Sequence, residues 1–87
     1  MKFYFVYILQ SLRDKLFYIG LTNNLNRRLS EHQNGRNIST RNRRPLKLIF
    51  YEAYLNKEDA ERRERYFKST KGKTTLKQLI REYLKED

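Results

Sequence analysis

The stretch Phe3-Tyr-Phe-Val-Tyr-Ile-Leu9 decides how the rest of this chain can fold. Successive side chains of a strand point to opposite faces of a sheet, and both alternating sets are apolar here. Such a strand needs cover on both faces, which predicts a central place in the sheet. The stretch is too short to span a bilayer and has no small-residue cleavage site, so we interpret it as neither an anchor nor a signal peptide.

Two more strands and three helices are expected around this strand. The strands cover residues 16–21 and 46–55, and a short polar hairpin joins the first of them to residues 3–9. Helices are predicted over residues 24–34, 57–69 and 74–85, with a stop at Gly35, an N-cap at Asn56 and a break at Gly72. The order ββαβαα predicts an α/β fold of the α+β kind, with a three-stranded antiparallel sheet flanked by helices.

Composition narrows the class of protein further. The 87 residues fit one domain, residues 1–87, with 20 Lys and Arg against 10 Asp and Glu, a net charge of +10. Cysteine is absent, which excludes disulfides and thiolate metal sites, and one histidine excludes a His-rich metal cage. We expect a soluble, cytoplasmic protein with a polyanionic partner. Nucleic acid is the first candidate, and an acidic protein or membrane surface is the weaker alternative.

The positive charge is concentrated in residues 27–47. The polar segment 36–47 within it is predicted to be a loop that contacts phosphate groups, and the alternative is a solvated loop without a partner. The only acidic residue in the whole stretch is Glu31, whereas its basic residues are Arg27, Arg28, Arg36, Arg41, Arg43, Arg44 and Lys47.

Several polar residues fall on or beside predicted apolar helix faces. At 100° per residue, Arg28 and His32 flank the apolar stripe of the first helix, and Glu64 lies on the inward face of the second. A buried carboxylate is costly unless it is paired or binds a metal. The alternatives are a structural ion pair between Glu64 and Arg28 or an edge position that reaches water. Likewise, His32 could be a partly buried core residue, and Tyr7 and Tyr18 could be core aromatics.

Together these residues resemble the signature of the GIY-YIG nuclease family. Tyr7, the triplet Tyr18-Ile19-Gly20, Arg28, His32 and Glu64 occur in the family's order over nearly the whole chain. The similarity is greatest to small free-standing bacterial members that consist of this domain alone. Three positions depart from the pattern. Only the tyrosine of the first motif is kept in Phe5-Val6-Tyr7, Leu21 stands where excision nucleases of the family carry a lysine, and no asparagine follows Asn56.

The resemblance implies hydrolysis of phosphodiester bonds with one divalent cation, Mg²⁺ or Mn²⁺. It implies that Glu64 holds the metal and that Arg28 holds the scissile phosphate. It also implies that a tyrosine orients or deprotonates the attacking water. Tyr18 is the first choice for that base and Tyr7 for positioning, although the sequence does not separate them. His32 is then a hydrogen-bond partner of a tyrosine or a proton relay.

The implied function is therefore an endonuclease acting on DNA, with low sequence specificity or with preference for a DNA structure, and RNA is the other candidate substrate. A nucleic-acid-binding module of the same fold with little or no catalysis is the alternative. A protein-interaction domain that uses the basic loop is a third class.

Overall fold

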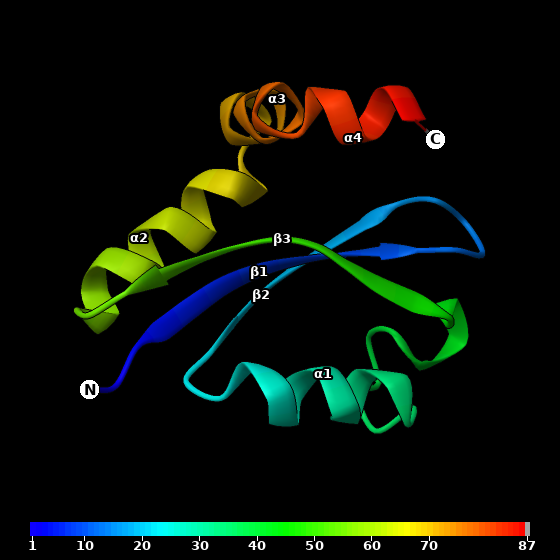
Figure 1. The fold of residues 1–87 in the computed structure, drawn as a ribbon, viewed down its shortest axis with the longest axis horizontal. Helices are drawn as coiled ribbons and strands as arrows, with labels where there is room; N and C mark the ends of the chain where they lie inside the picture. Colours follow the sequence, from blue (N-terminus) through cyan, green and yellow to red (C-terminus); the bar gives the residue numbers. More distant parts are fainter. Residues whose placement is uncertain (87) are drawn as a thin grey trace.

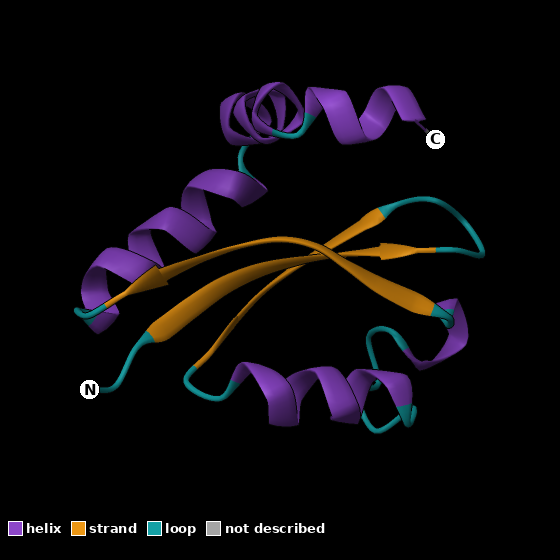
Figure 2. Cartoon of the chain, in the orientation of Figure 1, coloured by secondary structure: helices purple, strands orange, loops and turns teal. Residues whose placement is uncertain are grey.

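The computed structural model describes residues 1–86 and contains one three-stranded antiparallel sheet with helices on both faces. The strand order is β2-β1-β3. Helix α1 lies on one side of the sheet, and α2 and α3 lie on the other (Figures 1 and 2). The elements are β1 (Tyr4–Ser11), β2 (Phe17–Thr22), α1 (Leu25–Gln33), the 3₁₀-helix η1 (Arg41–Arg43), β3 (Leu46–Tyr54), α2 (Lys57–Lys68), α3 (Thr70–Leu79) and α4 (Arg81–Glu86).

The central position predicted for the first strand is confirmed. β1 pairs with β2 on one edge and with β3 on the other. Val6 and Ile8 pack with Phe67 of α2 on one face, whereas Tyr7 and Leu9 belong to a second buried cluster on the α1 face. The sheet thus separates two small hydrophobic cores, and the central strand contributes to both.

Helix α1 begins and ends as the sequence indicates. The Asn24 side chain accepts a hydrogen bond from the backbone N–H of Arg27, which caps the helix. Gly35 follows the last turn with φ of 75°, in the left-handed region that favours glycine. This helix carries Arg28 and His32 toward the sheet, so its placement fixes half of the candidate site.

The predicted break at residues 70–73 is wrong, and so is a single helix over 74–85. Ser69 alone separates α2 from α3: its hydroxyl donates to the Tyr66 carbonyl at 2.6 Å and accepts from the Gly72 N–H at 3.0 Å. Gly72 lies inside α3 and is buried. Only glycine fits at this position, because a Cβ would collide with the Tyr66 carbonyl. The last helical segment divides instead at Ile80, the C-cap of α3.

The final helix returns to the sheet. Tyr83 of α4 donates a hydrogen bond of 2.5 Å to the Gln10 side chain, and the Lys47 ammonium lies 5.1 Å from the centre of the Tyr83 ring. Among residues 1–86, no helix has the length and apolar character needed to cross a membrane.

Candidate active site

Tyr7 lies at the centre of the candidate site and is fully buried. It stands directly opposite Gly20 in the β1–β2 ladder. A Cβ at Gly20 would collide with the ring and hydroxyl of Tyr7, so only glycine lets the ring lie across the neighbouring strand. The glycine of the Tyr18-Ile19-Gly20 triplet therefore serves the tyrosine of the other strand.

A buried hydrogen-bonded chain runs from Tyr7 through His32 to Thr40. The Tyr7 hydroxyl is 2.8 Å from Nε2 of His32, and Nδ1 of His32 is 2.7 Å from the Thr40 hydroxyl. Burial, and then the positive charge of Arg28, lowers the pKa of His32, so the imidazole is neutral at pH 7. A neutral imidazole donates with one nitrogen and accepts with the other, and here each nitrogen has a hydroxyl partner.

Tyr7 itself stays protonated in this environment. Burial raises the pKa of Tyr7 to about 12; the Arg28 guanidinium opposes this rise, and the negative charge of Glu64 adds to it. Groups from α1 and α2 thus both act on one hydroxyl. Of the predicted site residues, His32 and Tyr18 contact Tyr7, whereas Arg28 and Glu64 act on it through their charges.

Arg28 connects the buried chain to the surface. Its Nε donates to Oε1 of Glu31 at 3.0 Å, one turn further along α1. The same side chain lines an open pocket of about 300 Å³ at the end of β2, together with Tyr4, Leu21, Thr22, Asn23 and Lys57. The pocket therefore carries two positive charges.

Glu64 occupies the inward side of α2, with 21% of its side chain exposed. Its carboxylate lies 3.3 Å from Nζ of Lys68, whereas Arg28 pairs with Glu31. A structural ion pair between Glu64 and Arg28 is therefore not what holds either residue. The described part of the chain has no group of three or more acidic, His or Cys side chains placed to share a metal ion.

Of the two candidate tyrosines, Tyr18 is the one that solvent reaches. Its ring centre lies 6.3 Å from that of Tyr7 and 5.1 Å from that of His32, and the residue is partly exposed. Three aromatic rings from two strands and one helix are thus packed together, with Tyr18 on the outer side.

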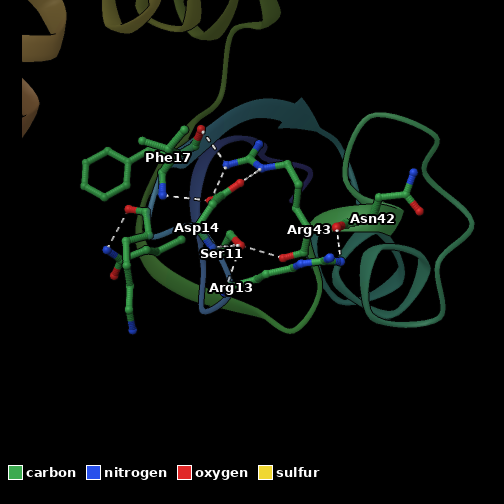
Figure 3. Close-up of polar contacts among 9 residues, drawn as sticks. Ser11, Arg13, Asp14, Phe17, Asn42 and Arg43 are labelled. Atoms are coloured by element: carbon green, nitrogen blue, oxygen red, sulfur yellow. Dashed lines mark hydrogen bonds and ion pairs between the residues drawn. The ribbon is translucent and has the colours of Figure 1, made fainter.

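The basic loop is fastened to the β1–β2 hairpin instead of being freely solvated. Arg43 pairs with Asp14 at 2.9 Å, its carbonyl accepts from the Ser11 hydroxyl at 2.6 Å, and Arg13 donates to the Asn42 carbonyl at 2.9 Å (Figure 3). The Arg43 guanidinium holds the pKa of Asp14 at about 2. Arg43 is therefore occupied by a contact within the chain.

Some of the other predicted phosphate-binding residues also have partners within the chain, and the rest are exposed. Arg44 donates to the carbonyls of Arg41 and Gln33 at 2.9 and 3.4 Å, and Lys47 lies over Tyr83. The side chain of Arg27 lies 3.9 Å from Glu31 but is 61% exposed. Arg36 and Arg41 are exposed at the loop surface.

Sequence reasoning missed Thr40 and Glu31. Thr40 is fully buried and bonds His32, yet it lies in a polar, glycine-containing stretch with no periodicity to mark it. Glu31 was noticed only as a lone negative charge, although its position three residues after Arg28 is the spacing at which helix side chains meet. That spacing is the signal that could have found it.

Comparisons with known proteins identify the family of this chain. A family model described as the GIY-YIG catalytic domain matches residues 3–78, and the chain belongs to this family. It is 38% identical over 84 residues to a UPF0213 protein of Clostridium perfringens, covering 95% of this chain and 89% of the relative.

Two further relatives agree. A UPF0213 protein of Lactiplantibacillus plantarum is 38% identical over 81 residues, covering 90% and 78% of the two chains. The solution NMR structure of a UPF0213 protein from Bacillus halodurans matches with a TM-score of 0.56 at 35% identity, covering 88% of this chain and 84% of that one. The fold predicted from the sequence is thus confirmed by a solved relative.

Proposed function

We propose that this protein is a metal-dependent endonuclease that hydrolyses phosphodiester bonds of DNA, with low sequence specificity or with preference for a DNA structure. The observation that carries the proposal is the convergence on Tyr7. The charges or rings of Tyr18, Arg28, His32 and Glu64 reach it from three different elements. A histidine bonded to this buried hydroxyl, with a cation and an anion that both act on its pKa, is more than core packing needs.

Arg28 is the residue suited to the scissile phosphate. Its guanidinium is held by Glu31 on one side and opens on the other into the pocket that Lys57 also lines. A planar guanidinium offers paired donors to phosphate oxygens and neutralises charge that builds on them during attack. The pocket and its two cations provide the place where the phosphate group binds.

Glu64 fits the cation that this chemistry uses. Mg²⁺ and Mn²⁺ prefer oxygen ligands and are often held by one or two carboxylates, with water and substrate phosphate completing the shell. A single half-buried carboxylate meets that need, and the Lys68 side chain beside it is 56% exposed and free to turn away. Such a cation, when bound, polarises the phosphate and lowers the pKa of its water.

The two tyrosines take different tasks in this proposal. Tyr18 is partly exposed and contacts the attacking water, whereas Tyr7 is fully buried and cannot touch substrate without a rearrangement. Tyr7 positions His32 through its hydroxyl. Neutral His32, which is hydrogen-bonded to the Tyr7 hydroxyl, is the member of this cluster that can accept a proton.

The test is cleavage of a panel of labelled single-stranded, duplex, flapped and branched DNA and RNA in Mg²⁺ or Mn²⁺. We expect Glu64→Gln to lower the cleavage rate by at least about 100-fold, beyond the effect of removing an outer-shell group. Glu61→Gln, one turn earlier on α2, is the matched control and should cleave like wild type. Chelation of the metal should abolish cleavage by wild type and by Glu61→Gln.

The outcome that contradicts the proposal is equally clear. If wild type binds these nucleic acids but cleaves none of them in either metal, the chain is the binding module of this fold instead. Equal rates for Glu64→Gln and Glu61→Gln would remove Glu64 from the site even if cleavage is seen.

A further inference from the structure

Helix α1 leaves part of its face of the sheet without a helix over it. Helix α1 packs through Leu25 and Leu29 on the cluster of Tyr7, Leu9 and Leu46. The region around the start of β1 has no helix over it on this side (Figure 1). The side chains there belong to alternate residues of β1 and to their partners on β3.

These uncovered side chains are aromatic. Phe3 is 37% exposed and Tyr51 is 52% exposed, and Phe5 lies between them, with ring centres 6.4 Å from Phe3 and 6.0 Å from Tyr51. Tyr51 stands directly opposite Tyr7 in the β1–β3 ladder. We call Phe3, Phe5 and Tyr51 the aromatic strip; it begins at Tyr51, beside Tyr7, and follows β1 toward the start of that strand.

The charge around the strip is positive. The only carboxylate carried by the three strands is Glu52, which belongs to the opposite face and pairs with Arg63 of α2 at 2.8 Å. Thr22, the cross-strand partner of Phe5, lines the pocket that holds Arg28 and Lys57. Two cations thus lie beyond Thr22, on the β2 side of Phe5.

We propose that the aromatic strip is a stacking platform for unpaired nucleotides, so that the enzyme binds single-stranded nucleic acid next to the phosphate it cleaves. The cleavage in this inference rests on the proposed function, whereas the binding rests on the strip alone. Exposed aromatic rings on an open sheet beside basic groups suit bases that are splayed out, because every base has a face to stack. Bases inside a duplex are stacked on each other and do not offer that face.

A second copy of the chain is the less suitable occupant. At about 200 Å² for a whole aromatic side chain, the exposed parts of Phe3 and Tyr51 amount to roughly 200 Å². A stable dimer needs about 800 Å² from each partner. The strip is therefore too small for a dimer but large enough for one or two bases.

The experiment measures binding without metal, so that cleavage does not interfere. The probes are a fluorescent oligothymidylate of about 12 nucleotides and a hairpin duplex of matched length. We expect Tyr51→Ala to weaken oligothymidylate binding about five- to tenfold, the loss of one base stack, and to leave duplex binding unchanged. The matched control is Leu16→Ala, which removes an apolar side chain of 64% exposure at the β1–β2 hairpin.

A second variant reports the location of the bound strand. The chain has no tryptophan, so Tyr51→Trp places a single indole in the strip and preserves a stacking surface. Its fluorescence should be quenched by oligothymidylate and not by the duplex, with affinity close to that of wild type. Unchanged affinity in Tyr51→Ala, or no quenching in Tyr51→Trp, would overturn the platform.

Two additional results separate the platform from its alternatives. Sedimentation of the wild type as a dimer that Tyr51→Ala converts to a monomer would assign the strip to self-association and overturn the proposal. Cleavage assays in Mn²⁺ are scored separately. Absent cleavage with intact, Tyr51-dependent binding would defeat the nuclease and keep the platform, and cleavage without that dependence would do the reverse.

Discussion

Tyr7 is at once a core residue and the centre of the candidate site. Its ring packs with Leu9 and Leu46, while its hydroxyl bonds His32. Substitutions at this position therefore change stability and chemistry together, and they cannot separate the two. The residues that can separate them lie at the rim, where Arg28 and Glu64 are only partly buried.

Gly20→Ala should be strongly destabilising, because its Cβ would occupy the position of the buried Tyr7 ring. We expect a loss of about 1–3 kcal/mol in the free energy of unfolding, as for other overpacked cores. Urea denaturation of Gly20→Ala in the wild-type and Tyr7→Ala backgrounds forms a double-mutant cycle. The added methyl should cost much less once the ring is gone, and equal costs would show that another contact is responsible.

His32 should make stability fall in mildly acidic solution. Its pKa is lowered from 6.5 in the folded state, so below pH 6.5 the unfolded chain binds more protons and unfolding is favoured. Unfolding free energy should decrease as pH falls, by about 1.4 kcal/mol for each unit by which the folded pKa lies below 6.5, and then level off. His32 is the only histidine, so His32→Gln should lose this decrease; an unchanged profile would assign it elsewhere.

Site residues were predictable to the extent that they belong to regular elements. Arg28, His32 and Glu64 follow from helical spacing together with the family resemblance. Thr40 lies in a loop, where no period links position to direction, and its role depends on how the loop folds back on α1. The choice between Tyr7 and Tyr18 required exposure, which two tyrosines on neighbouring strands do not reveal in sequence.

At the scale of elements, loops and joints departed from prediction more than strands did. Gly72 was interpreted as a helix breaker, but it is a close-contact residue inside α3, because the turn at Ser69 presses the helix start against Tyr66. The same is true of the basic loop: its composition predicted arginines that contact phosphate groups, with a solvated loop as the alternative, whereas Arg43 is tied to Asp14. Composition records polarity but not partners.

The basic loop should therefore contain arginines that bind phosphate and arginines that stabilise the fold. Arg41→Ala should reduce the log–log salt slope of duplex DNA binding by about 0.9, the effect of one phosphate contact, and leave the Tm unchanged. Arg43→Ala should instead lower the Tm, and this difference should shrink as the pH falls from 3.8 toward about 2, where Asp14 becomes protonated. Titrations at several salt concentrations and thermal melts check both, and a lower Tm for Arg41→Ala alone would reverse the assignment.

For the whole molecule, a net charge of +10 is confined within a radius of gyration of 12.8 Å. This size is close to the Debye length of about 10 Å at 0.1 M salt, so like charges across the molecule repel one another at low salt. Raising NaCl from about 0.05 to about 0.5 M should increase the Tm through screening while weakening nucleic-acid binding.

The control for this salt response reduces the charge. Changing Lys71, Lys73 and Lys77 of α3 to Gln lowers the net charge by three at exposed positions. The variant should start with a higher Tm at low salt and respond less to NaCl. A Tm that is independent of salt in both proteins would show that self-repulsion does not limit stability.

The central position of β1 also sets the order in which the molecule can be completed during synthesis. The first cross-strand neighbour of Tyr7, Gly20, is synthesised soon after it, but the second, Tyr51, emerges 44 residues after Tyr7 itself. Glu64 follows later still. A nascent chain therefore exposes the arginines of residues 27–44 before β3 completes the sheet and before Glu64 is present to hold a metal. On the proposed function, the growing chain therefore has no nuclease activity until α2 has been synthesised and Glu64 can hold the metal.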